Sequence, residues 1–307
     1  MFKKLVKKLI AAACVIGMTC AITLSSAACN IETAHPKVRI SVEFNEVVYE
    51  LDYTLYRDMY PNTVRHFIEL SESGFYNDVL IHNYRTSDWF SGGYSYNADD
   101  YAHSSAVQAY ADYLENHSKE SEYSELVNDG TLTPTVFAKT KYDDSGKEVI
   151  DSESALPTLV GEFDSNKFHE IENGALNAEM GVLKMFYYEK SATQKAYVRF
   201  ENDQPYMRDY KYNCATSVFA MQVGASSSYS EDKYCVFGKM DSTSALTDLI
   251  DAIDEYFDGS VTSVSANDVN VDNYENFSEK DSDRGIEVDF VLPSQPIVIK
   301  TIKVIGY

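Results

Sequence analysis

Basic residues are scarce in this chain of 307 residues, and that scarcity narrows what the protein can bind. Lysine and arginine together number 26 against 48 aspartates and glutamates, so the formal net charge is -22 at pH 7. Nucleic acids and anionic lipid surfaces are negatively charged and repel such a protein. The composition therefore argues against nucleic-acid binding and against a domain that lies flat on an anionic membrane.

Motifs that bind metals or phosphate groups are also missing. The sequence has no Gly-x-Ser-x-Gly motif and no glycine-rich phosphate loop. The turn Asp143–Gly146 does not have the ligand spacing of a calcium loop. The six histidines do not have the spacing of a metal site, and they are His35, His66, His82, His103, His117 and His169. We therefore expect neither a metal nor a cofactor.

Cysteine is rare, and three of the five cysteines lie in the first 29 residues. The other two are Cys214 and Cys235. We expect residues 217–221 and 234–240 to pair as a hairpin in which Cys235 faces Met221. Cys214 would then lie roughly 23 Å away along its strand, whereas a disulfide needs Cα atoms within about 7 Å. The spacing predicts two free, buried cysteines.

A long hydrophobic run occurs at the N-terminus, over residues 9–24. Four lysines precede it, and the small residues Ser25–Ala28 follow it, directly before Cys29. This order is typical of a secretory signal peptide, and a cysteine after the small residues is typical of a lipidation site. The alternatives are an ordinary signal peptide with an incidental Cys29, a weaker lipidation site at Cys20, and a membrane span. A span is disfavoured because Thr, Gly and Ser interrupt the short apolar core.

We therefore expect residues 1–28 to be removed and Cys29 to carry a lipid. Residues 29–37 would be a short tether, and residues 38–307 the folded domain. The expected location is extracytoplasmic, with the protein lipid-anchored to a bacterial cell membrane.

Alternating apolar residues predict a fold dominated by strands. Two amphipathic helices are expected, one from Pro61 to the glycine at Gly74 and one over residues 244–257. Many strands with one helix early and one late predict an antiparallel barrel or sheet with helices at its ends. The expected strands cover residues 38–44, 48–56, 79–85, 181–185, 217–221, 234–240 and 296–304.

Two segments break this pattern, and we interpret both as insertions. Residues 94–160 contain helical spacing around Ala106–Leu114 and again around Tyr123–Val127. Residues 186–213 are rich in tyrosine and charge, and we expect them to be irregular. Most of the 24 tyrosines of the chain are expected to pack and hydrogen-bond, and a sugar- or peptide-binding surface is the alternative.

Short motifs in a fixed order resemble the cyclophilins, a family of peptidyl-prolyl cis-trans isomerases. They are Pro61–Val64, Gly74–Tyr76, Gly92–Gly93, Gly161–Phe163, Val236–Lys239 and Pro296–Ile299. The resemblance implies a closed eight-stranded antiparallel β-barrel capped by two helices. It also implies rotation about X–Pro bonds as the activity and proline-containing peptides as partners.

The resemblance also assigns site residues, and several of them differ from the family pattern. Asn83 stands where the family has its catalytic arginine. Ser91 replaces a glutamine, and Tyr234 replaces a histidine. The other positions that the resemblance implies for substrate binding are His82, Trp89, Phe219 and Tyr229. His82 can equally be read as a core histidine of its strand.

Arg85 is the candidate that could replace the missing arginine. It lies two residues beyond Asn83, so on a strand both would face the same side, about 6.6–7 Å apart. An arginine side chain is long enough to lean back over much of that gap. Arg199 and Arg208 are less constrained alternatives, and Arg85 could also be an ordinary surface arginine.

The sequence thus favours a membrane-anchored isomerase that acts on exported proteins, with activity reduced by the change at Asn83. The alternative is a non-catalytic cyclophilin-fold lipoprotein that binds a protein or peptide partner. A solute-binding lipoprotein fits the anchor, but it predicts two α/β lobes that the strand pattern opposes.

Overall fold

The computed structural model describes most of the barrel and parts of the insertions. The described residues are 35–101, 113, 116–132, 137–146, 148–150, 159, 162, 176–186, 189–198, 206–212, 217–225, 234–258, 263–265 and 291–307. The predicted signal segment, with Cys29 and most of the tether, lies outside them. Within the described residues, no helix combines the length and the apolar character that a membrane crossing needs.

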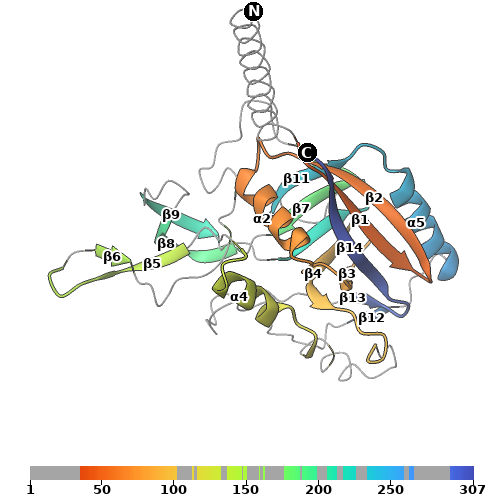
Figure 1. Ribbon diagram of the computed structural model, residues 1–307, viewed down its shortest axis with the longest axis horizontal. Coiled ribbons are helices and arrows are strands. Elements are labelled where there is room, and N and C mark those ends of the chain that lie inside the picture. The colour runs from red at the N-terminus through yellow and green to blue at the C-terminus, as the bar shows by residue number, and fades with distance from the viewer. Residues whose placement is uncertain are drawn as a thin grey trace, which may run out of the picture.

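Eight antiparallel strands form a closed barrel (Figure 1). Their order around the wall is β3-β14-β1-β2-β11-β7-β10-β4, and pairing of β4 with β3 closes the ring. The strands are β1 (Lys37–Phe44), β2 (Val47–Leu55), β3 (Val79–Tyr84), β4 (Asp88–Ser95), β7 (Val182–Phe186), β10 (Phe219–Gln222), β11 (Tyr234–Met240) and β14 (Ile297–Gly306). The predicted fold class is confirmed.

Alternating side chains explain why these segments form barrel strands. In β1 the residues Val38, Ile40, Val42 and Phe44 are at most 2 % exposed, while the residues between them are more exposed. The next two residues, Asn45 and Glu46, both have positive φ, which suits a tight two-residue hairpin turn into β2. A period of two with one apolar side therefore gives each strand one face toward the barrel interior.

Two helices close the ends of the barrel. Helix α2 (Pro61–Glu72) buries Val64 and Phe67 in the core, and helix α5 (Ser244–Tyr256) buries Leu246, Leu249 and Ile253. The two helices lie toward opposite ends of the barrel (Figure 1). Both predicted helices are confirmed.

The N-terminus of α2 is held by a carboxylate from a distant part of the chain. Glu162 accepts hydrogen bonds from the backbone N–H groups of Asn62 and Thr63 and from both of their side chains, at 2.7–3.0 Å. Helix N-termini leave backbone donors without intrahelical partners and favour negative charge. Burial raises the pKa of Glu162, and these four hydrogen bonds oppose the rise.

The expected hairpin between residues 217–221 and 234–240 is wrong, because another strand separates the two. In the barrel β7 lies between β10 and β11, and Cys235 faces Met185 rather than Met221. The short apolar strand 181–185 inserts there because its Leu183 and Met185 supply the interior face of the wall. Cys235 is buried and is not in a disulfide, as predicted, and Cys214 lies outside the described residues.

The two predicted insertions contribute strands to one common sheet. The four-stranded sheet has the order β6-β5-β8-β9, so the first insertion pairs with the second through β5 and β8. Its strands are β5 (Phe137–Tyr142), β6 (Glu148–Ile150), β8 (Glu189–Val198) and β9 (Tyr206–Tyr212). Residues 186–213 are therefore more regular than expected.

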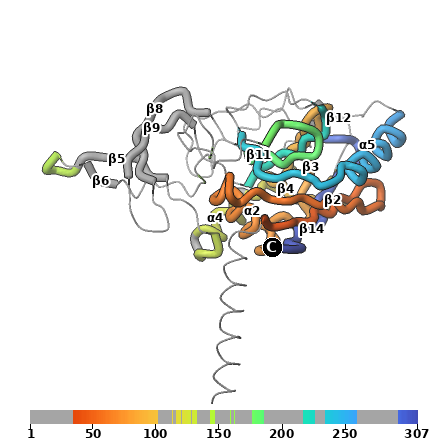
Figure 2. The backbone as a smooth tube through the Cα atoms, turned by 90° about the horizontal axis from the view of Figure 1, so that it is seen from above, coloured from red at the N-terminus to blue at the C-terminus, as the bar shows by residue number. Residues whose placement is uncertain are grey.

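Three further short elements complete the described structure. Helix α4 (Glu120–Asn128) confirms the helical spacing around Tyr123–Val127, whereas most of Ala106–Leu114 lies outside the described residues. Strands β12 (Ser263–Ser265) and β13 (Val291–Pro293) extend the barrel sheet next to β3. Figure 2 shows α5 beside the β1–β2 hairpin when the molecule is seen from above.

Candidate functional site

Asn83 and Arg85 lie together where β3 turns toward β4. The register between the two strands shifts between Ile81 and Asn83, so Asn83 lies opposite Phe90 on the outer side of the wall. Asn83 is only 2 % exposed, and Arg85 is partly exposed. The Nε of Arg85 donates a hydrogen bond to Oδ1 of Asn83 at 3.1 Å. The guanidinium therefore leans back over the position where the resemblance implies an arginine.

A buried ion pair lies on the outer wall of the barrel near this turn. The Nζ of Lys184 in β7 lies 2.7 Å from Oδ1 of Asp88, the first residue of β4. The two residues are 2 % and 0 % exposed. The ammonium also lies 4.6 Å from the centre of the Tyr234 ring, within the range of a cation–π interaction.

The strand register explains how Lys184 reaches Asp88. In the intervening strand β10, Ala220 pairs with Lys184 on one side and with Phe90 of β4 on the other. Directly paired residues share a face of the sheet, and alanine adds only a methyl group above it. The lysine side chain can therefore cross β10 and meet the carboxylate on the next strand.

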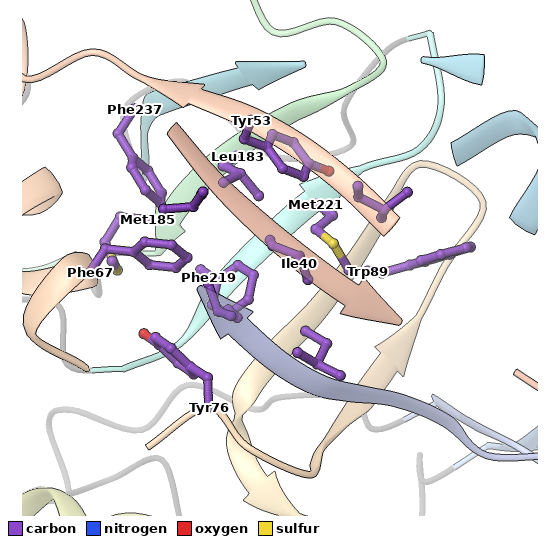
Figure 3. Close-up of a cluster of buried hydrophobic side chains, with 14 of the residues drawn as sticks. Ile40, Tyr53, Phe67, Tyr76, Trp89, Leu183, Met185, Phe219, Met221 and Phe237 are labelled. Atoms are coloured by element: carbon purple, nitrogen blue, oxygen red, sulfur yellow. The ribbon is translucent and has the colours of Figure 1, made fainter. Parts of the chain in front are cut away.

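Two predicted pocket residues lie inside the barrel instead of lining an outer pocket. Trp89 is 1 % exposed and Phe219 is 0 % exposed, and both belong to the main hydrophobic core (Figure 3). The Phe219 ring packs edge-on against Phe67 and Tyr76. Because side chains alternate along a strand, the neighbours of Trp89 and Phe219, not these rings themselves, face the outer wall. The role of Trp89 and Phe219 in holding a proline ring stays a prediction.

Ser91, which was expected to bind substrate, also turns toward the interior. It is 0 % exposed, and its hydroxyl donates to the backbone carbonyl of Leu80 at 2.7 Å. Its neighbour Gly92 has φ +89 and approaches Ser217 so closely that an added Cβ would lie 2.3 Å from the Ser217 carbonyl oxygen. This stretch of β4 therefore makes close contacts between strands, and the role of Ser91 in substrate binding stays a prediction.

His82 is fully buried and behaves as a core histidine. Its ring lies 5.2 Å from that of Tyr94, in an edge-to-face arrangement. Burial lowers the pKa of His82 to about 3, and a hydrogen bond with the backbone of Leu80 opposes the shift only in part. The imidazole is neutral at physiological pH, so it is not a cationic donor.

Of the remaining predicted residues, Tyr234 and Arg208 lie in the described part of the chain, and Tyr229 and Arg199 do not. Tyr234 lies on the outer wall beside Lys184. Arg208 belongs to β9 in the second sheet and not to the barrel wall that holds Asn83.

Sequence reasoning missed Asp88 and Lys184. The sequence did contain a signal for a buried ion pair. Lys184 stands within the apolar run Val182–Met185, and the other residues of that run are buried. A charged residue at such a position needs a partner of opposite charge. The sequence alone, however, does not say which carboxylate lies opposite.

The described part of the chain gives no sign of a metal centre. In the ranges that the structure describes, no group of three histidine, cysteine, aspartate or glutamate side chains is arranged to hold a metal ion. Near the turn from β3 to β4, the polar groups include the arginine–asparagine contact and the lysine–aspartate pair.

Comparisons with known proteins give one family-model match and several similar solved structures. The family model described as "Cyclophilin type peptidyl-prolyl cis-trans isomerase/CLD" matches residues 39–276. A search of curated protein sequences found no match.

Solved structures of cyclophilins are similar at low identity. A cyclophilin-type peptidyl-prolyl cis-trans isomerase of Cryptosporidium parvum is 13% identical, with 89% of this chain and 99% of that chain covered and a TM-score of 0.36. The same enzyme in the presence of the dipeptide Ala-Pro is 14% identical, with 88% and 99% covered and a TM-score of 0.36. The Mimivirus cyclophilin is 14% identical, with 72% and 80% covered and a TM-score of 0.32.

The family model spans well over half of the sequence, from the first barrel strand to beyond α5. This chain belongs to the cyclophilin-type peptidyl-prolyl cis-trans isomerase family.

Proposed function

We propose that this protein catalyses cis-trans isomerisation of X–Pro peptide bonds, with Arg85 as the donor and Asn83 as the residue that positions it. The observation that carries the proposal is the 3.1 Å hydrogen bond from Nε of Arg85 to Oδ1 of Asn83. It brings the guanidinium next to Asn83, which stands where the family resemblance implies an arginine.

The chemistry needs a fixed donor more than a reactive side chain. Rotation about the peptide bond has a barrier of about 18–20 kcal/mol because the C–N bond is partly double. A donor near the prolyl nitrogen or the carbonyl favours the twisted amide, in which that double-bond character is lost. Arginine suits this role because it stays charged and presents several N–H donors in one plane. In the proposal Nε binds Asn83, and the terminal Nη groups donate to the substrate.

The substrates in this proposal are proline-containing segments of exported proteins. One solved cyclophilin-type isomerase was crystallised in the presence of the dipeptide Ala-Pro, which makes Ala-Pro peptides a natural first probe. Uncatalysed X–Pro exchange takes tens to hundreds of seconds and can limit folding. A catalyst of this step would therefore act on client proteins as they fold.

NMR exchange spectroscopy on a short Ala-Pro peptide tests the proposal. Catalytic amounts of the protein are expected to raise the cis-trans exchange rate above the spontaneous rate, and the amides of Asn83, Arg85 and Thr86 are expected to shift. Absence of rate enhancement at saturating protein would overturn the catalytic proposal.

The second candidate is binding without catalysis, and Asn83 favours it, because this residue stands where the family has its catalytic arginine. On the described part of the outer wall, Asp88, Lys184 and Tyr234 are all at most 4 % exposed. If the peptide causes shifts but no faster exchange, the non-catalytic alternative explains the data better.

We also propose that the protein acts at a membrane surface through a lipid on Cys29. The support is the order of lysines, apolar run and small residues that precedes Cys29. Expressed in a bacterium, the full chain is expected in the membrane fraction, and Cys29→Ser is expected to leave it. The matched control is Cys20→Ser, which should not change the fractionation. A membrane-bound Cys29→Ser variant would contradict the proposal.

A further inference from the structure

Large apolar side chains are exposed at the β1–β2 hairpin, at the end of the barrel that α5 covers. Val47 is 50 % exposed and Tyr256, at the end of α5, is 49 % exposed. The hairpin and the C-terminal end of α5 lie side by side in both views (Figures 1 and 2). Neither residue takes part in the proposed isomerase chemistry.

A buried phenylalanine joins these side chains into one surface. The Phe44 ring packs edge-on against Tyr256 with 5.5 Å between ring centres, and it lies 6.2 Å from Phe257. Val47 pairs directly with Phe44 across the hairpin, so the two share a face. We call this surface the hairpin patch, and it consists of Phe44, Val47, Tyr49, Tyr256 and Phe257.

The rim of the hairpin patch is acidic. Glu46 precedes Val47 in the turn, Glu255 precedes Tyr256 in α5, and Asp258 follows Phe257, and all three carboxylates are exposed. The sequence has no lysine, arginine or histidine between residues 240 and 279. The patch therefore combines exposed aromatic and aliphatic surface with a helix, α5, that has acidic but no basic side chains.

The apolar surface and acidic rim of the hairpin patch restrict which molecules can bind there. A second copy of the chain would bring the same acidic rim, and like charges across an interface oppose association. Anionic lipid is repelled for the same reason. A segment with apolar side chains flanked by lysine or arginine satisfies both features, because it covers the apolar surface and neutralises the rim.

We propose that the hairpin patch is a docking surface for a cationic amphipathic segment of a partner protein. The apolar side chains of the segment contact Val47 and Tyr256, and its basic side chains face Glu46 and Glu255. The patch is at the far end of β1 from Lys37, so a chain tethered through its N-terminus would present it away from the tether.

Binding of two synthetic peptides to the full chain tests this proposal. The first is an amphipathic peptide of leucine and lysine, and the second has glutamate in place of every lysine. Fluorescence anisotropy of the labelled peptides is expected to show binding of the first only, with an affinity that falls as salt is added.

Two pairs of substitutions separate the apolar and the charged contributions. Val47→Ser with Tyr256→Ser is expected to weaken binding about tenfold, because about 1.4 kcal/mol of apolar burial corresponds to that factor. Glu46→Gln with Glu255→Gln is expected to weaken binding about threefold and to flatten the salt dependence. Circular dichroism verifies that each variant is folded.

Ile305→Ser is the matched control, since Ile305 is 45 % exposed in the last strand and is not part of the patch. It is expected to bind like the wild type. Equal loss in Ile305→Ser, or unchanged binding in the Val47/Tyr256 variant, would overturn the proposal. Self-association in light scattering that the Val47/Tyr256 substitutions abolish would also overturn it, in favour of a second copy as occupant.

Discussion

Lys184 and Asp88 form an ion pair that is almost completely removed from solvent. Taking two charges out of water costs several kcal/mol for each ion, and their attraction offsets this only when geometry and partners are good. Here the ammonium has the carboxylate at 2.7 Å and the face of Tyr234 at 4.6 Å. Removing one of the two charged groups should therefore destabilise the protein far more than removing both.

Substituting the lysine alone should destabilise the protein strongly. Lys184→Met leaves the Asp88 carboxylate buried without its cation, which we expect to lower the free energy of unfolding by about 3–5 kcal/mol. The double variant Lys184→Met with Asp88→Asn removes both charges, and we expect it to recover most of that loss. Urea unfolding of the two variants measures the difference, and equal stability of the single and double variants would contradict this account.

The buried His82 should make stability depend on pH. Its pKa is about 3 in the folded protein and about 6.5 in an unfolded chain. Between these values the unfolded chain binds a proton that the folded protein does not, so stability falls as the pH drops from about 6.5 toward 3. From pH 7 to pH 4.5 the loss is expected to be roughly 2–3 kcal/mol.

Urea unfolding at both pH values isolates this contribution. In His82→Gln the difference in the free energy of unfolding between pH 7 and pH 4.5 should shrink by about 2–3 kcal/mol. This expectation does not depend on how stable the variant itself is. His35, which is partly exposed, provides the control, and His35→Gln should keep the wild-type difference. An unchanged pH dependence in His82→Gln would show that His82 is not the responsible group.

At the scale of elements, the close contact between β4 and the segment before β10 depends on one glycine. Gly92 has φ +89, and an added Cβ would lie 2.3 Å from the carbonyl oxygen of Ser217. That carbonyl accepts a hydrogen bond from the Tyr76 hydroxyl at 2.8 Å, and the Ser217 hydroxyl donates to the Gly92 carbonyl at 2.8 Å. The contact fixes the wall on which Asn83 and Arg85 lie.

Gly92→Ala should therefore lower the stability of the protein by more than the backbone strain alone would. Gly130 supplies the matched control, because its φ is +81 and an added Cβ would meet no atom within 4 Å. Gly130→Ala is expected to cost about 1–2 kcal/mol from the left-handed backbone, and Gly92→Ala a further 1–3 kcal/mol from overpacking. Thermal unfolding compares the two, and equal effects would argue against the close contact.

The same scale shows where sequence reasoning succeeded. The apolar pattern located seven of the eight barrel strands, all but β4, and the stripe of Leu246, Leu249 and Ile253 located α5. These signals are local, since a period of two or of about 3.6 is visible within one segment. Pairing is not local, which is why β7 was not expected between β10 and β11.

Across the whole molecule, long-range contacts account for what the sequence did not reveal. Glu162 holds the start of α2 across about a hundred residues of chain, and Lys184 meets Asp88 across a similar separation. The placement of Trp89 and Phe219 inside the wall follows from strand register, which a motif match does not determine. The contact between Arg85 and Asn83 was predictable because it depends only on the short spacing between Asn83 in β3 and Arg85 just beyond the end of that strand.

The most direct test of the central claim is the kcat/KM of Arg85→Ala on an Ala-Pro peptide. If Arg85 is the donor, kcat/KM should fall by about 10²–10³-fold, the usual effect of removing one preorganised donor. Arg57→Ala, which changes an arginine beside Tyr307, should retain wild-type activity. Wild-type activity in Arg85→Ala would contradict the account.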